Sequence, residues 1–173
     1  MTRDYPAEPA DEFPRPPRTV TDREGRDVEL VAADGADRDS VLEMYAAFDP
    51  ADRAQGIPPS REDAIEEWLD TILSEDTLNV VAVHDDAVVG HATLVPDNHG
   101  EHELAIFVLQ SFQGAGIGTN LVETLLGSAQ SEGFEKVWLT VERWNDPAVA
   151  LYRKVGFETT EAESFEIEMS IRL

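Results

Sequence analysis

Two apolar segments in the second half of the chain, with a helix-like segment between them, place the strongest limit on the fold. Residues 103–109, ELAIFVL, and residues 136–141, KVWLTV, are nearly continuous apolar runs of strand length. Such runs are typical of strands that are buried on both faces. Between them, residues 118–132 carry leucine, valine and alanine at helical spacing. The order strand, helix, strand predicts an α+β fold in which these elements share one core.

The first half adds further strands and two helices. RTVT and RDVELV flank a turn at Gly25, and LNVVAV and VVGHATLV flank a turn at Asp85-Asp86, so two antiparallel pairs are predicted. One helix is expected to begin near Asp37 or Asp39. A second, SREDAIEEWLDTIL, is expected to be capped by Ser60, and the loop FDPADRAQGIPP joins the two. The tail SFEIEMSIRL alternates like a final strand. We expect one domain over residues 18–173.

Half of the ten prolines fall within the first seventeen residues. Proline favours extended backbone and cannot continue a helix. Residues 1–17 are therefore predicted to form an extended or mobile N-terminal arm. Tyr5 and Phe13 could dock this arm on the domain, but a solvated tail is the default expectation.

The charge balance limits the partners and hints at the solvent. There are 36 acidic and 13 basic side chains, a net charge of -23 and a pI near 4.2. A nucleic-acid partner is not expected, because neutralising phosphates needs a basic surface. Only Lys136 and Lys154 are lysines. A diffuse acidic excess with so little lysine is typical of a protein that works in concentrated salt, where self-repulsion is screened. An acidic protein of ordinary salt is the alternative.

Other classes of site are disfavoured by composition. The chain has no cysteine, and its four histidines lack metal-ligand spacing, so neither a disulfide nor a metal site is expected. No apolar run is long enough to span a membrane, and the first residues lack the apolar stretch of a secretory signal. We therefore expect a cytoplasmic protein without a membrane partner.

A glycine-rich segment, Gln113-Gly114-Ala115-Gly116-Ile117-Gly118, lies between a predicted strand and a predicted helix. Glycines let the backbone turn tightly, and successive N–H groups at a helix N-terminus can hold a phosphate without a basic side chain. The spacing differs from the dinucleotide fingerprint, and the Walker A lysine is missing. A plain packing turn is the alternative interpretation of this segment alone.

A second motif, NDPAVALYRKVGF, occupies residues 145–157. Asn145 is suited to cap a helix, Pro147 to its first turn and Gly156 to its end. Tyr152 lies two turns from Asn145 on the same face, where its hydroxyl could donate a proton. Taken alone, this segment is as well explained by a capped amphipathic helix with a core tyrosine.

Together the two motifs resemble the GNAT superfamily, the Gcn5-related N-acetyltransferases. Gln113, Gly116 and Gly118 match its Q/R-x-x-G-x-G/A loop. Asn145, the Leu151-Tyr152 pair and Gly156-Phe157 match its second motif. The resemblance covers the chain from about Arg18 onward and implies a single domain with a mixed central sheet and helices on both faces.

The resemblance also implies acetyl-CoA as acetyl donor, without a metal. In the family, a central strand separates from its parallel neighbour, and the pantetheine arm binds along the strand edge that is left free. In this chain the arm would contact Ile106, Phe107 and Val108. The pyrophosphate would rest on backbone amides of the glycine-rich loop, and Asn145 would contact the cofactor from the other side. The implied cofactor-binding residues of that loop are Gln113, Gly114, Ala115, Gly116, Ile117, Gly118 and Thr119.

Two side chains are expected to move protons. Tyr152, by the resemblance, would protonate the departing thiolate as general acid. Glu103 begins the strand ELAIFV, where many family members carry a glutamate, and is the candidate general base for the acceptor amine. Desolvation there would raise its pKa. The alternative is a solvated acid among many, since several family members use only water.

One position departs from the family pattern and leaves the phosphates without a nearby cation. Ala115 stands where the family commonly has arginine or lysine. Arg143, Arg153 and Lys154 could partly compensate, or could be ordinary surface charge.

The sequence does not identify the acceptor of the acetyl group. Its pocket is expected between residues 48–68 and 161–165. The opening hairpin and FDPADR resemble, more loosely, the protein lysine acetyltransferase subgroup. An amine of a protein, a small-molecule amine, and a non-catalytic module that binds acyl-CoA all stay open, as does a homodimer.

Overall fold

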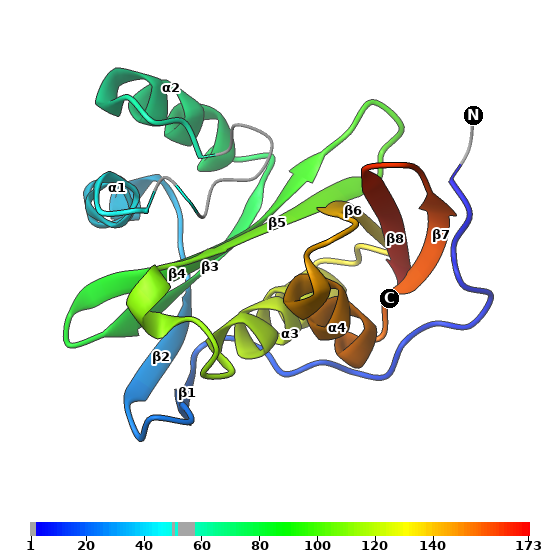
Figure 1. Ribbon diagram of the computed structural model, residues 1–173, viewed down its shortest axis with the longest axis horizontal. Helices are drawn as coiled ribbons and strands as arrows, with labels where there is room; N and C mark the ends of the chain where they lie inside the picture. The colour runs from blue at the N-terminus through cyan, green and yellow to red at the C-terminus, as the bar shows by residue number, and fades with distance from the viewer. Residues whose placement is uncertain (1–2, 50, 52–57) are drawn as a thin grey trace.

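The computed structural model describes residues 3–49, 51 and 58–173, and these form one mixed sheet covered by helices on both faces (Figure 1). The strands lie in the order β1-β2-β3-β4-β5-β6-β8-β7, and every neighbouring pair is antiparallel except β5 and β6. The strands are β1 (Arg18–Thr21), β2 (Asp27–Ala32), β3 (Leu78–His84), β4 (Ala87–Pro96), β5 (His102–Val108), β6 (Lys136–Glu142), β7 (Glu158–Ala162) and β8 (Glu166–Arg172).

The helices divide the hydrophobic core into two parts. On one face lie α1 (Arg38–Ala46) and α2 (Glu62–Ile72), and on the other lie α3 (Ile117–Ser131) and α4 (Asp146–Val155) (Figure 1). The larger cluster surrounds α3 and α4, and the smaller one joins α1 and α2 to β3 and β4. Side chains alternate along β5, so that Ile106 packs toward α3 while Phe107 packs toward α1 and α2. The predicted α+β fold is confirmed.

The local predictions are mostly confirmed, with corrections at caps and burial. Asp85 and Asp86 both adopt positive φ, 48° and 65°, in the predicted β3–β4 turn. The cap predicted at Ser60 is wrong: α2 is preceded by Arg61, without a side-chain cap. The short strand β7 has no counterpart in the predictions. Most of the predicted loop between α1 and α2, residues 50 and 52–57, lies outside the described residues.

The N-terminal segment, residues 3–17, is packed along the domain and is not the solvated tail expected by default. It starts beside β7 and β8 and runs below α4 and α3 to β1 (Figure 1). The Ala10 N–H donates to the Arg172 carbonyl at 2.7 Å, and the Phe13 N–H donates to Gln130 Oε1 at 2.8 Å. Proline-rich extended backbone has free carbonyls, and the domain supplies donors to them: Arg172 Nε lies 2.7 Å from the Pro6 oxygen.

A buried polar chain crosses the smaller core. The Asn79 amide donates to the Ile72 carbonyl at 3.0 Å, which leaves Asn79 Oδ1 to accept from His91 Nε2 at 2.7 Å. His91 Nδ1 therefore accepts from the Tyr45 hydroxyl, at 2.6 Å. Burial lowers the pKa of His91 to about 3, so this imidazole is neutral and its tautomer is set by its neighbours. The network satisfies three polar side chains inside the sheet.

Candidate active site

The parallel strands β5 and β6 separate almost as soon as they meet. They pair only at His102↔Val137 and Glu103↔Trp138, whereas β5 continues to pair with β4 along its whole length. Beyond Glu103, one edge of β5 has no strand partner among the described residues. This separation also corrects the prediction that residues 103–109 are buried on both faces: within β5 only Leu104 is fully buried. An open strand edge with unused backbone groups can accept an extended ligand.

The glycine-rich loop follows β5 and ends at the N-terminus of α3. Gly114 and Gly116 have φ of 71° and 91°, a region that side chains with a Cβ rarely adopt. Gly116 occupies the N-cap position, so no side chain caps the helix. The first amides of α3, including Gly118 and Thr119, therefore have no intrahelical acceptor. The first turn of α3 carries no acidic residue, and uncapped amides with the positive helix end form a site suited to an anion.

Gly118 is where the loop, β5 and α4 come together. A Cβ built on Gly118 would lie 3.0 Å from Leu151 Cδ1 and 3.6 Å from Ile106 Cδ1. Gln113 ties the loop to β5, because its Nε2 donates to the Val108 carbonyl at 3.0 Å. That bond occupies the carbonyl of one residue predicted to engage the cofactor. Ala115 and Ile117 bury their side chains in the core, so they can offer only backbone groups to a ligand.

Helix α4 presents the second motif on the same side of the sheet as α3. Asn145 caps it, with Oδ1 accepting from the Ala148 N–H at 3.3 Å, and its amide end stays exposed. Tyr152 is buried and packs edge-on against Phe157, with ring centroids 5.8 Å apart. No described residue bonds to the Tyr152 hydroxyl. Burial raises the pKa of Tyr152 well above its ordinary value, so its hydroxyl keeps its proton and can donate it.

Glu103 lies at the point where β5 and β6 separate, on the face toward α1 and α2. It is half-buried, and burial raises the pKa of the Glu103 carboxyl. The charge of Arg3 opposes this rise, while the carboxylates of Asp97 and Glu166 add to it. Arg3 itself is held by the Trp138 ring, 3.4 Å from its guanidinium carbon, and by Glu168. The docked N-terminal segment thus places a cation near the predicted base, which the sequence analysis did not anticipate.

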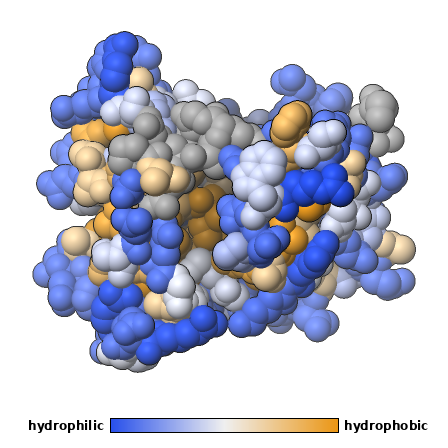
Figure 2. Space-filling view, in the orientation of Figure 1, coloured by the Kyte–Doolittle hydropathy of each residue, from blue (hydrophilic) through white to orange (hydrophobic). Residues whose placement is uncertain are grey.

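An aromatic cluster lines the same face of β5. Phe107 packs edge-on against Tyr45, Phe48 and Trp68, with ring centroids 5.5 to 6.1 Å apart. Phe107, Phe48 and Trp68 are only partly buried. Figure 2 shows this face of the molecule hollowed between the part that carries α1 and α2 and the part that carries β6 to β8, with an apolar floor and a hydrophilic rim. Because side chains alternate along a strand, the sequence alone indicates that residues 103, 105 and 107 share this face.

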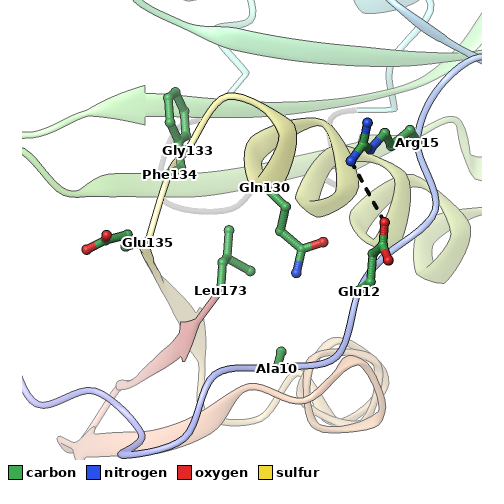
Figure 3. Close-up of a pocket in the computed structure, with 8 residues that line it drawn as sticks. All are labelled: Ala10, Glu12, Arg15, Gln130, Gly133, Phe134, Glu135 and Leu173. Carbon is green, nitrogen blue, oxygen red and sulfur yellow. Dashed lines mark ion pairs between the residues drawn. The ribbon is translucent and has the colours of Figure 1, made fainter.

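Two other observations limit the site. The described residues hold no group of three His, Asp or Glu side chains placed to bind a metal ion, and none of their helices is long and apolar enough to cross a membrane. Figure 3 shows a depression of about 460 Å³, but it lies between the N-terminal segment and the connection from α3 to β6. That is the opposite end of the 15-residue helix α3 from the glycine-rich loop, about 22 Å away, so we assign the depression no part in the site.

Comparisons with known proteins find relatives by sequence and similar folds among solved structures. A mycothiol acetyltransferase of Saccharomonospora viridis is 33% identical over 141 residues, which cover 75% of this chain and 45% of that protein. The GNAT domain of S. lividans PAT has a similar fold, with a TM-score of 0.75 and 16% identity, covering 91% of this chain and 97% of that one. The PaiA N-acetyltransferase of Thermoplasma acidophilum, in complex with coenzyme A, has a TM-score of 0.61 and 18% identity, covering 84% and 99%.

The matched region contains both motifs and the strand that precedes them. This chain spans about half the length of the curated relatives that it matches, 57% of one and 45% of another. The sequence model of the acetyltransferase (GNAT) family matches residues 39–157, which include β5, the glycine-rich loop, α3 and α4. The chain belongs to the acetyltransferase (GNAT) family.

Proposed function

We propose that the protein is an N-acetyltransferase that transfers the acetyl group of acetyl-CoA to a primary amine. The observation that carries this proposal is the separation of β5 from β6 beside an uncapped, glycine-rich helix N-terminus. An extended ligand with an anionic group fits such a place: its chain can add to the edge of β5 while its anion meets the amides of α3. Family membership and the coenzyme A bound by the Thermoplasma relative support the same ligand.

The proposed cofactor contacts are mainly backbone groups. The amides from Gly114 to Thr119 would hold the pyrophosphate, and the free edge of β5 at Ile106 and Phe107 would hold the pantetheine arm. Gly118 supports the fit, because a side chain there would fill the narrow space that Leu151 and Ile106 already border. Asn145 would contact the arm through its exposed amide. When bound, acetyl-CoA would supply an activated acetyl group as a thioester.

Glu103 and Tyr152 are proposed to move the protons of the transfer. An ammonium has no lone pair, so Glu103 would accept a proton from the acceptor, directly or through water, and the neutral amine would attack the thioester carbonyl carbon. The new C–N bond forms, the C–S bond breaks, and the acetylated nitrogen would release its second proton to water, from which Tyr152 would be reprotonated. Tyr152 would give its proton to the departing thiolate. Their environments suit these roles, because burial raises the pKa of both groups.

The acceptor is proposed to enter the hollow on the α1–α2 face, between the Phe107 cluster and the β7–β8 hairpin. A protein lysine or N-terminal amine is the first candidate, by the loose resemblance of the N-terminal hairpin to lysine acetyltransferases. A small-molecule amine is the second, because one relative is named a mycothiol acetyltransferase. The partly buried rings of Phe48, Trp68 and Phe107 favour an acceptor with an apolar or cationic portion.

A thiol-release assay with acetyl-CoA tests the proposal. Polyamines, amino sugars, amino acids and lysine-containing proteins would be compared in molar salt, and the acetylated product identified by mass spectrometry. Turnover with an amine, abolished or strongly reduced by Tyr152→Phe, is the expected result. Heat stabilisation by acetyl-CoA with no turnover on any acceptor would instead favour a non-catalytic module that binds acyl-CoA.

A further inference from the structure

The turn between β1 and β2, residues 22–26, lies directly against the glycine-rich loop. The Arg23 N–H donates to the Ala115 carbonyl at 3.0 Å. Arg26 Nη1 donates to the Ser111 carbonyl at 3.1 Å, and its guanidinium lies 4.1 Å from the centre of the Phe112 ring. The turn thus contacts the loop at Ala115 and the residues just before the loop at Ser111 and Phe112, although about ninety residues separate the two segments in the sequence.

Asp22 gives this turn one conformation. Its buried carboxylate accepts from the Glu24 and Arg26 backbone N–H groups, both at 2.9 Å, and from Arg26 Nε at 2.7 Å. The Gly25 N–H also donates to the Asp22 carbonyl, and Gly25 has a φ of 81°. A buried carboxylate with three donors is a rigid anchor. The position of the neighbouring Arg23 is therefore set by the fold.

The Arg23 side chain lies beside the glycine-rich loop and forms no side-chain hydrogen bond with a described residue of it. Its Nε lies 3.9 Å from the place that a Cβ on Gly116 would occupy. The side chain is exposed, and no described residue forms an ion pair or a side-chain hydrogen bond with it. Arg26, by contrast, is paired with Asp22 and stacked on Phe112. In a chain of net charge -23, an unpaired cation beside uncapped helix amides stands out from the surrounding acidity.

We propose that Arg23 binds the pyrophosphate of the cofactor, as the cation that the glycine-rich loop itself lacks. The inference rests on the proposed binding of acetyl-CoA. Residues 113–119 contain no basic side chain, so their amides supply dipoles but no full charge. A guanidinium beside Gly116 adds that charge and can donate two parallel hydrogen bonds to a phosphate. The turn of one hairpin then completes a site built by another part of the sheet.

The other basic side chains near the site suit this task less well. The Arg143 guanidinium donates to the Glu163 carbonyl at 2.9 Å, which holds it at the β7–β8 turn. Arg153 and Lys154 are exposed in the last turn of α4, and neither side chain forms a hydrogen bond or ion pair with a described residue of the loop. They are the competing assignment, and the test includes one of them.

The experiment measures binding of CoA and of 3′-dephospho-CoA to the full chain by calorimetry, at a salt concentration where circular dichroism shows it folded. The variants are Arg23→Gln, Arg23→Lys and Arg153→Gln, with Arg15→Gln as the matched control at an exposed arginine far from the loop. Arg23→Gln is expected to raise the Kd of both ligands by about tenfold. Arg23→Lys should recover part of this loss, and Arg15→Gln should change the Kd less than about twofold.

Each of the other outcomes contradicts either the inference about Arg23 or the proposed function. A Kd unchanged by Arg23→Gln while the wild-type chain binds CoA overturns the inference alone, and a loss confined to Arg153→Gln does the same. A loss that disappears with 3′-dephospho-CoA moves Arg23 from the pyrophosphate to the 3′-phosphate and overturns the assignment. A folded wild-type chain that binds no CoA overturns the proposed function, and the inference with it. Because no described residue pairs with the Arg23 side chain, both Arg23 variants should keep the wild-type melting temperature.

Discussion

Replacing Gly127 by alanine tests whether the N-terminal segment is packed on α3. Gly127 is buried in the middle of that helix, and a Cβ built on it would lie 1.9 Å from the Pro14 oxygen and 2.5 Å from the Pro14 carbonyl carbon. Both are backbone atoms, so no side-chain rotation relieves the overlap. In a helix without this neighbour, the same change would be favourable by about 1 kcal/mol, because glycine is the poorer helix former. A packed segment and a solvated segment therefore predict opposite signs for the change in the free energy of unfolding.

The size of the loss follows from what holds the segment. Displacing residues 10–14 breaks hydrogen bonds from the Phe13 N–H to Gln130, from Gln130 to the Asp11 carbonyl and from the Ala10 N–H to Arg172. Each contributes about 1 kcal/mol, and Phe13 loses partial burial. The released chain regains conformational entropy, and the helix gains its alanine. We expect Gly127→Ala to lower the free energy of unfolding by about 1–3 kcal/mol.

Urea denaturation and limited proteolysis measure the two consequences. Gly127→Ala should unfold at lower urea and be cleaved faster near Tyr5 and Phe13 by a protease that prefers aromatic residues. Ser128→Ala is the control, since it makes the neighbouring change in α3 without meeting the segment. If Gly127→Ala instead stabilises the protein and leaves cleavage unchanged, the segment is solvated in solution and the packing described above is refuted.

The remaining predictions concern the proton-moving groups and the solvent. Glu103→Gln should remove the acid limb of the pH profile of kcat/KM. It should not lower the melting temperature at pH 8, because the fold raises the pKa of Glu103 and therefore disfavours the charged carboxylate that the wild type carries at that pH. Tyr152→Phe should reduce kcat about 100-fold or more while changing the Kd of CoA little, because only the proton donor is lost. Burial lowers the pKa of His91 to about 3, so the contribution of the neutral imidazole to stability is complete above pH 6.5. That contribution is lost as the pH falls from 6.5 toward 3, by roughly 1.4 kcal/mol per pH unit. Nitrogen NMR should show a neutral His91 imidazole at pH 5. Transfer from molar to low salt should reduce the far-UV circular dichroism if the acidity is an adaptation to salt, and an unchanged signal would argue for an ordinary acidic protein.

Features written in local sequence were predictable. Alternation and turn residues located both hairpins, and the glycines of residues 114–116 predicted a tight turn before a helix, where the structure has positive φ at Gly114 and Gly116. Asn145 and Gly156 marked the two ends of α4, where the structure has a side-chain cap and a φ of 124°. These signals work because each depends on neighbours within a few residues. They predicted where the loop and the second motif lie, but not what else touches them.

The missed features depend on contacts between distant segments. Residues 103–109 are as apolar as a strand buried on both faces, yet β5 is half-open because its parallel neighbour diverges after Glu103. The prolines predict an extended arm, but its docking depends on Gln130 and Arg172, which lie far along the chain and donate to the Asp11 and Pro6 carbonyls. Arg23 stands in the unremarkable turn DREG, and only the sheet places it beside Gly116.

The distribution of charge at the site gives the acidity a physical meaning. Residues 113–119 and the first turn of α3 carry none of the 36 carboxylates, so these segments themselves add no like-charge repulsion to a polyanionic ligand. Attraction by backbone amides acts over hydrogen-bond distances, within the Debye length of about 3 Å at 1 M salt, and survives screening. Long-range repulsion from the rest of the surface does not survive it. Concentrated salt would therefore favour binding at an amide-lined site, whereas it would weaken a site that relied on several exposed lysines. By the same argument, Arg23 beside the loop would act on the ligand in concentrated salt only at hydrogen-bond distance, where screening is weak.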